Sequence, residues 1–254
     1  MYNSFQELRE NGVGKMSKAA DLIRKIKHTT CSVVVVAAGS SVRMGEDKLF
    51  LDLEGKPVLA WTLQALNSCD FVDEIVVVAR EDALEQTAKL CLDYSIDKVG
   101  KVIIGGKNRN ESALAGVSSI RREAKLVLIH DGARPLVTEE IVRDAMHTAA
   151  MYKCAAPAIP VTDTVKEQEN DIVIRTPDRT QLAAVQTPQA FVPEIIKGAL
   201  TKAVKDGTEY TDDCAAVEAM GFTVRLSKGS PENIKITKAM DMQIAAAIIR
   251  SRNE

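Results

Sequence analysis

Aromatic residues and paired cysteines are both scarce in this chain of 254 residues. Aromatic side chains make up 4% of the residues, too few for the stacking platforms that bind single-stranded nucleic acids. The five cysteines contain no Cys-x-x-Cys pair and lie at positions 31, 69, 91, 154 and 214. Their number and spacing exclude a zinc ribbon and give no disulfide framework. We therefore predict a cytoplasmic location, because the cytoplasm keeps thiols reduced.

Long apolar runs and an excess of charge of either sign are also absent. Apolar runs such as residues 33–38 fall far short of the roughly 20 residues that a membrane-spanning helix needs. Residues 1–30 carry acidic side chains and no apolar signal-peptide segment. Lys and Arg number 33 and Asp and Glu number 35, so the net charge is −2. Because the charge is so balanced, we expect no nucleic acid and no membrane among the partners.

The chain does contain enough apolar side chain for a sizeable core. Hydrophobic residues make up 46% and charged residues 27%, close to the average of soluble globular proteins. Ahead of this core, residues 1–30 predict an amphipathic helical extension, in which apolar residues recur at helical spacing among basic ones: Met16, Ala19, Ala20, Ile23 and Ile26. Such a helix packs on the domain or at a subunit contact, or it binds a membrane surface or a partner.

From residue 31 onward, short apolar runs alternate with helical stretches. The runs predict buried strands at 32–37, 74–79, 102–104 and 126–130. The stretches between them predict helices at 58–67, 83–93, 110–122 and 139–150. Later residues predict helices at 193–205 and 211–220, a strand at 222–226 and a last helix at 237–251. This alternation predicts an α/β fold with a Rossmann-like, doubly wound, mostly parallel sheet, in one domain over residues 31–254.

Residues 161–175 predict a β-hairpin that interrupts this alternation. Apolar residues flank a polar tip at residues 169–171, as in a hairpin turn. An isolated hairpin is marginally stable in water, so it must pack on its own domain or on another subunit. We favour a protruding arm, over about residues 161–185, that reaches a second subunit.

In an open parallel sheet, ligands bind at the carboxyl ends of the strands, so the loops there are candidate sites. The loop after the first strand begins with small residues that let the backbone approach a ligand, and Arg43 and Lys48 add two cations. This loop indicates a phosphate site, best suited to a triphosphate. The alternative is a plain turn with solvated basic side chains. Neither a Gly-x-Gly-x-x-Gly dinucleotide motif nor a Walker A motif is present.

Two further strand ends carry candidate residues. In the loop 105–112, paired glycines precede a helix, and Ser112 either reaches a base or takes part in helix capping. In the loop 130–135, Asp131 suggests a contact with a metal or a substrate hydroxyl. Arg134 either binds a phosphate or pairs with Asp131. His130 is interpreted as a packed strand-end residue rather than a base.

Ordered motifs along residues 32–249 together resemble one family. These motifs are AAGSSVRMG followed by Lys48, GGKNRNESALAG, IHDGARP, PVTDTVK, QTPQAF, YTDD and NIKIT. In this order they resemble the 2-C-methyl-D-erythritol 4-phosphate cytidylyltransferase family of the non-mevalonate isoprenoid pathway. The resemblance implies a nucleotidyltransferase fold with a homodimerising β-arm. It also implies that CTP and 2-C-methyl-D-erythritol 4-phosphate react to give 4-diphosphocytidyl-2-C-methyl-D-erythritol and pyrophosphate.

The resemblance further implies roles for single residues. The catalytic residues would be Arg43, Lys48 and Lys235. The nucleotide would be bound by Ala37, Ala38, Gly39, Gly106, Lys107 and Ser112. The acceptor would be bound by Asp131, Arg134, Thr164, Arg179 and Thr187, of which Thr164 and Arg179 would come from a second subunit. Mg²⁺ would be held mainly by the CTP phosphates, with Asp131 and Glu232 as candidate protein contacts. Spacing alone does not show that the late residues cluster.

The residue inventory agrees with this chemistry and leaves three other functions to consider. A phosphate oxygen is already an anion, so the reaction needs positioning and positive charge rather than a strong base. A ribitol 5-phosphate cytidylyltransferase would share the nucleotide half and is the nearest alternative. An NAD-dependent oxidoreductase is disfavoured by the broken glycine motif. A non-catalytic nucleotide-binding module is disfavoured by the joint presence of Arg43, Lys48, Asp131 and Lys235.

Overall fold

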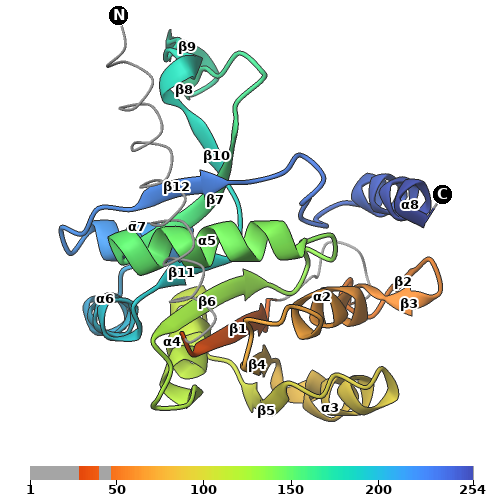
Figure 1. Ribbon diagram of the computed structural model, residues 1–254. Coiled ribbons are helices and arrows are strands. Elements are labelled where there is room, and N and C mark those ends of the chain that lie inside the picture. The colour runs from red at the N-terminus through yellow and green to blue at the C-terminus, as the bar shows by residue number, and fades with distance from the viewer. Residues whose placement is uncertain (1–28, 40–46, 254) are drawn as a thin grey trace, which may run out of the picture.

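The computed structural model describes residues 29–39 and 47–253. The helix predicted within residues 1–30 and the catalytic candidate Arg43 lie outside the described residues, apart from Thr29 and Thr30. Figure 1 shows the described part as a central sheet with helices around it and a narrow arm that extends from one end.

A sheet of eight strands runs through the described residues. Its parallel part comprises β5 (Val99–Ile104), β4 (Glu74–Ala79), β1 (Cys31–Ala37) and β6 (Leu126–Asp131), in that spatial order. Valine and isoleucine dominate β1 and β4, and these residues suit strands whose two faces are both covered. The strands predicted at these four places are confirmed.

Beyond β6 the sheet becomes mixed in direction. There β11 (Gln189–Phe191) lies antiparallel between β6 and β7 (Cys154–Pro160), and β10 (Ala183–Val185) pairs with the far end of β7. The edge strand β12 (Arg225–Lys228) runs parallel to β7. The strand predicted at 222–226 therefore begins three residues too early. Phe222 and Val224 pack against the core ahead of the ladder, which explains the apolar pattern there.

Helices cover both faces of the sheet. One face packs against α2 (Val58–Asn67), α3 (Leu84–Asp93), α5 (Glu139–Tyr152) and α8 (Ala239–Asn253). The other packs against α4 (Arg109–Ser119), α6 (Pro193–Asp206) and α7 (Asp213–Glu218). Along β1, Val33 and Val35 enter the first core cluster and Val34 enters the second. This alternation confirms the doubly wound α/β fold. None of the described helices is long and apolar enough to cross a bilayer.

The arm in Figure 1 is built on a small hairpin. Its strands are β8 (Glu167–Glu169) and β9 (Ile172–Arg175), joined by a turn in which Asn170 and Asp171 have positive φ values. The hairpin is confirmed, but its strands are shorter than the predicted segment. The remaining short elements are β2 (Asp52–Leu53), β3 (Lys56–Pro57) and the 3-10 turns η2 (Glu81–Ala83) and η3 (Arg179–Gln181).

Candidate active site

A cavity of about 420 Å³ opens at the carboxyl ends of β1 and β6, where open α/β sheets bind ligands. Its lining comes from the loop after β1, the loop between β5 and α4, the end of β6, and the segment between β12 and α8. Nine residues that were predicted for the site line this cavity: Ala37, Ala38, Gly39, Lys48, Gly106, Lys107, Ser112, Asp131 and Lys235. The structure thus brings together residues that are far apart in the sequence.

The loop between β5 and α4 is shaped by its glycines and by the first turn of the helix. A Cβ atom at Gly105 would lie 2.5 Å from the Ala38 Cβ and 2.8 Å from the Ser112 Oγ, so only glycine fits there. Asn108 caps α4 by accepting a hydrogen bond from the Glu111 N–H. The Ser112 hydroxyl donates to the Asn108 carbonyl at 2.8 Å and accepts from the Gly106 N–H at 3.1 Å. Ser112 therefore holds the loop in place as well as lining the cavity.

Asp131, the last residue of β6, lies among three cationic side chains. Lys235 Nζ is 2.8 Å from Asp131 Oδ2, and Arg109 Nη2 and Arg134 Nε each lie 3.8 Å from a carboxylate oxygen. Burial alone would raise the pKa of Asp131, but the charges of Lys235 and Arg109 hold that pKa at about 2. Asp131 is therefore ionised at neutral pH and fixes the position of Lys235.

The cavity as a whole favours a polyanion. Its charged lining residues are Lys48, Lys107, Arg109, Asp131 and Lys235, four cations and one carboxylate among the described residues. Burial, followed by repulsion from Lys235, lowers the pKa of Lys48 below its usual value, while Asp131 opposes the shift. Two ammonium groups that repel each other at one cavity are stabilised when an anion binds between them.

Arg109 was missed as a site residue although it stands within the GGKNRNES motif. It makes two hydrogen bonds to Asp213, Nη1 to Oδ1 at 2.7 Å and Nη2 to Oδ2 at 2.6 Å. Burial would lower the pKa of Arg109, but the carboxylates of Asp213 and Asp131 more than offset this and raise it. Asp213 lies in the YTDD motif. One indication of this contact was present in the sequence, because the GGKNRNES and YTDD motifs are both polar segments at the start of a predicted helix.

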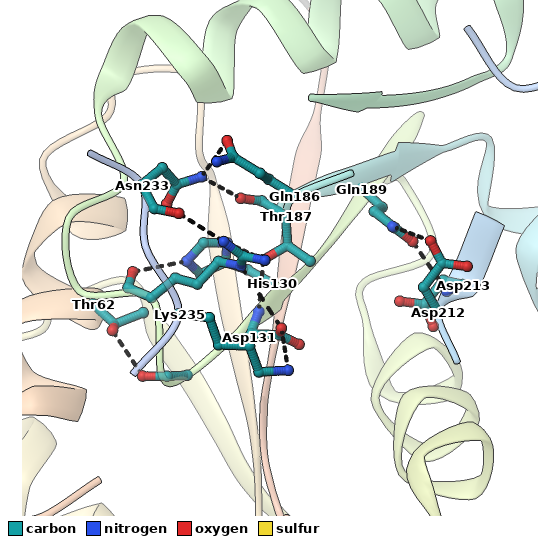
Figure 2. A network of polar contacts seen from close by, with 12 residues as sticks. Thr62, His130, Asp131, Gln186, Thr187, Gln189, Asp212, Asp213, Asn233 and Lys235 are labelled. Carbon is teal, nitrogen blue, oxygen red and sulfur yellow. Dashed lines mark hydrogen bonds and ion pairs between the residues drawn. The ribbon is translucent and has the colours of Figure 1, made fainter. Parts of the chain in front are cut away.

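A buried polar network lies directly behind Asp131 (Figure 2). His130 and Thr187 are 0% and 5% exposed. The Thr187 hydroxyl lies 3.0 Å from His130 Nδ1 and accepts from the Asp131 N–H at 3.1 Å, and His130 Nε2 lies 3.2 Å from the Arg134 carbonyl. Burial lowers the pKa of His130 to about 4, so it is neutral at pH 7. This agrees with the interpretation of His130 as a packed strand-end residue.

A second set of contacts anchors the segment that carries Lys235. Asn233 Nδ2 donates to the Thr187 carbonyl at 2.9 Å, and Arg134 Nη1 donates to the Asn233 carbonyl at 2.6 Å. Gln186 exchanges hydrogen bonds with the backbone of Ser230, with its Nε2 donating at 2.8 Å and its Oε1 accepting at 3.2 Å. The chain just before Lys235 is thereby tied to the connection between β10 and β11. Figure 2 shows Asn233, Gln186 and Thr187 converging there.

Among the predicted residues that the structure describes, five do not line the cavity. Arg134 and Thr187 lie behind its wall, in the contacts just described. Thr164 and Arg179 are exposed on the arm, where Arg179 donates to the Thr162 carbonyl at 2.8 Å. Glu232 forms an ion pair with Arg252 at 2.8 Å and has no place at the cavity.

The donor set limits how a divalent cation could be held. Within the described residues, no three His, Cys, Asp or Glu side chains are grouped as a metal site. Asp131 is the one carboxylate among the described lining residues. Magnesium is commonly bound by one or two carboxylates together with substrate phosphates. The cavity therefore fits a Mg²⁺ ion that arrives with a polyphosphate and does not fit a dedicated protein cage.

Comparison with known proteins connects this chain to one family. The family described as "IspD: 2-C-methyl-D-erythritol 4-phosphate cytidylyltransferase" matches residues 31–251. A protein of that name from Caldanaerobacter subterraneus is 41% identical over 223 residues, which cover 86% of this chain and 98% of the relative. Another, from Halalkalibacterium halodurans, is 42% identical over 223 residues, with coverages of 87% and 97%. The crystal structure of 4-diphosphocytidyl-2C-methyl-D-erythritol synthase from Anaerococcus prevotii superposes with a TM-score of 0.78 at 29% identity, and the match covers 87% and 99% of the two chains.

Proposed function

The chain belongs to the 2-C-methyl-D-erythritol 4-phosphate cytidylyltransferase family, and from this premise we propose how its residues carry out the reaction. It transfers the cytidylyl group of CTP to 2-C-methyl-D-erythritol 4-phosphate and releases pyrophosphate. The observation that carries the assignment of roles is the cavity whose described lining combines four cationic side chains with the carboxylate of Asp131. The names of the relatives favour this acceptor over ribitol 5-phosphate.

The nucleotide occupies the side of the cavity formed by the two loops with small residues. Ala37 ends β1, and Ala38 and Gly39 follow it; because these residues are small, the backbone can contact the cytidine. Gly106, Lys107 and Ser112 approach from the start of α4. The triphosphate then extends toward Lys48, and we assign to Arg43 a second contact with the same phosphates.

Charge stabilisation is the main chemical task of the site. A phosphate oxygen of the acceptor attacks the α-phosphorus of CTP; a new P–O bond forms, and the bond to pyrophosphate breaks. The attacking group is already an anion, so no proton has to be removed. Lys48 and Arg43 neutralise the charge that develops on the α-phosphate, and Lys235 holds the attacking phosphate in line.

The divalent cation is the one component that the residues do not supply. Mg²⁺, when bound, would supply positive charge that offsets the charge on the triphosphate and on the leaving pyrophosphate. Asp131, the one carboxylate among the described lining residues, would be its contact with the protein. The same carboxylate orients Lys235, and Arg134 completes the acceptor side from behind.

The acceptor pocket is completed by a second copy of the chain. Thr164 and Arg179 are exposed on the arm, and the arm also exposes the apolar side chains of Ile172, Val173 and Ile174. Burial of these apolar residues against a partner would hold the arm in place and bring Arg179 to the partner's cavity.

All five cysteines are free and buried, which supports a reducing compartment and a cytoplasmic location.

Pyrophosphate release tests the proposed reaction. The enzyme is supplied with CTP and Mg²⁺ and with either 2-C-methyl-D-erythritol 4-phosphate or ribitol 5-phosphate. We expect turnover with the first acceptor and at most a trace with the second. Turnover with ribitol 5-phosphate alone would keep the nucleotide half and overturn the acceptor assignment.

Mixed dimers test whether two chains share each site. Arg179→Ala and Lys235→Ala are each expected to be nearly inactive alone. If Arg179 acts in the partner's site, half of the dimers in an equal mixture are mixed and each has one intact site, so activity recovers to about a quarter of wild type. No recovery after subunit exchange would show that Arg179 acts within its own chain or not at all.

A further inference from the structure

The contacts of Thr187 leave its hydroxyl no hydrogen for a ligand. The Arg134 carbonyl can only accept, so the Nε2 of His130 that faces it at 3.2 Å carries the ring proton. His130 Nδ1 is then an acceptor, and the Thr187 hydroxyl donates to it at 3.0 Å. The Thr187 oxygen in turn accepts from the Asp131 N–H at 3.1 Å. The hydrogens of His130 Nε2, the Thr187 hydroxyl and the Asp131 N–H are therefore each donated to one acceptor.

These contacts join two separate parts of the fold. Thr187 lies in the connection between β10 and β11, whereas His130, Asp131 and Arg134 belong to the end of β6 and the turn that follows it. Figure 2 shows the Thr187 side chain between His130 and the Asp131 backbone, with Lys235 on the far side of Asp131. A hydrogen-bond partner at the Asp131 N–H and another at the Arg134 carbonyl hold the turn at both ends.

The turn from Asp131 to Arg134 positions the charged side chains on the acceptor side of the cavity. Asp131 Oδ2 lies 2.8 Å from Lys235 Nζ, and Arg134 Nη1 donates to the Asn233 carbonyl, two residues before Lys235. A shift of the turn would therefore move Asp131, Arg134 and Lys235 together. The nucleotide side depends on other segments, the loop after β1 and the start of α4.

We propose that His130 and Thr187 form a positioning pair, which sets the Asp131 turn and so fixes Lys235 toward the acceptor phosphate, and that Thr187 does not bind the acceptor itself. This inference rests on the proposed function and deepens it, because it replaces a substrate-binding role for Thr187 with an indirect one. The pair acts through a hydrogen-bond chain in which the neutral imidazole is the terminal acceptor for the Thr187 hydroxyl.

Matched threonine variants separate positioning from simple folding effects. Thr187→Val keeps the side-chain shape and removes the hydroxyl, Thr187→Ser keeps the hydroxyl, and Thr87→Val is the control at a threonine that is 1% exposed on α3. We expect Thr187→Val to lower kcat/KM for the acceptor by about tenfold or more while KM for CTP changes less than about twofold. Thr187→Ser should recover most of the loss. An equal loss in Ser and Val, or parallel changes for CTP and acceptor, would overturn the proposal.

A double-mutant cycle with His130→Phe separates positioning from direct contact with the acceptor. If the two residues act as one unit, the double variant His130→Phe/Thr187→Val loses no more than the worse single variant, because either substitution already breaks the contact through which the pair holds the Asp131 turn. If the losses multiply, Thr187 acts on the acceptor independently of His130 and the proposal is wrong. Turnover by the wild-type enzyme in the same assay tests the proposed function separately. A failure of the proposed function can therefore be distinguished from a failure of the positioning proposal.

Discussion

At the scale of single residues, the cavity is defined by an excess of positive charge around one carboxylate. The loop after the first strand indicated Lys48 and a strand end indicated Asp131, whereas Lys235 was implied by the family resemblance of its motif. The sequence could not show that Lys235 reaches Asp131, since more than a hundred residues separate the two. Arg109 and Asn233 lie inside quoted motifs, but their contacts with Asp213 and Arg134 depend on tertiary structure that spacing does not encode.

Lys48→Ala tests the contribution of one cation to the chemical step. Removal of a preorganised charge contact costs roughly 10²–10³ in turnover, and the partial burial of Lys48 makes this contact stronger than one in open water. We expect kcat to fall by that amount while the circular dichroism spectrum stays unchanged. Lys89→Ala, at an exposed ion pair on α3, is the control and should keep full activity. Wild-type turnover in Lys48→Ala would remove Lys48 from the mechanism.

His130 should make stability depend on pH between about 4 and 6.5. Its pKa is 6.5 when unperturbed and about 4 in the folded protein, so in this window the unfolded chain binds the extra proton. The free energy of unfolding is therefore at its full value above pH 6.5 and falls toward pH 4, by up to about 3 kcal/mol. Urea unfolding at pH 7, 6 and 5 measures this slope.

Two histidine variants identify the source of that slope. His130→Asn should flatten it, because the titrating group is gone. His147→Asn should leave most of it in place, because His147 is only partly buried on α5. A slope that survives in His130→Asn would assign the pH dependence to other groups.

At the scale of elements, the strongest sequence patterns gave the most reliable predictions. The valine-rich β1 and β4 and the helices around them were predicted within a few residues, because buried parallel strands are continuous apolar runs. By contrast, β10 and β11 are three residues each, and half of their residues are alanine. Such short segments have no periodicity, and only their pairing with β6 and β7 makes them strands.

Two glycines in different helices should respond to alanine in opposite directions. A Cβ atom at Gly116 of α4 would lie 2.2 Å from Val34 Cγ1 and 2.9 Å from Val78 Cγ2, so Gly116→Ala should force α4 away from β1 and β4. We expect a loss of about 1–3 kcal/mol in unfolding free energy. Gly198→Ala in α6 meets only Met220 Cε at 4.0 Å, and it should stabilise the protein by about 0.4–1 kcal/mol. Denaturant unfolding of both variants checks the pair.

At the scale of the whole molecule, the arm carries apolar side chains that the described residues of its own chain leave exposed. Ile172, Val173 and Ile174 are 71%, 55% and 57% exposed, and the two-stranded sheet that holds them pairs with no strand of the main sheet. Exposed apolar side chains grouped on one short hairpin are typical of a protein contact.

Removal of apolar surface from the arm should therefore break the proposed dimer. We expect Ile172→Ser/Ile174→Ser to sediment as a monomer with a native circular dichroism spectrum and with little turnover, since Arg179 would no longer reach a second cavity. Leu92→Ser, at a leucine that is 80% exposed on α3, is the matched control and should remain dimeric and active. A fully active monomer would refute the shared site.

The late position of Lys235 has a consequence for how the chain is made. Synthesis proceeds from the amino terminus, and the loops of the nucleotide side are complete once β6 has emerged. Lys235 follows β12, which is among the last strands to leave the ribosome. Until then, Asp131 lacks the lysine that pairs with it. We therefore expect a nascent chain to hold CTP without consuming it, so that the enzyme begins to work only when its synthesis is nearly finished.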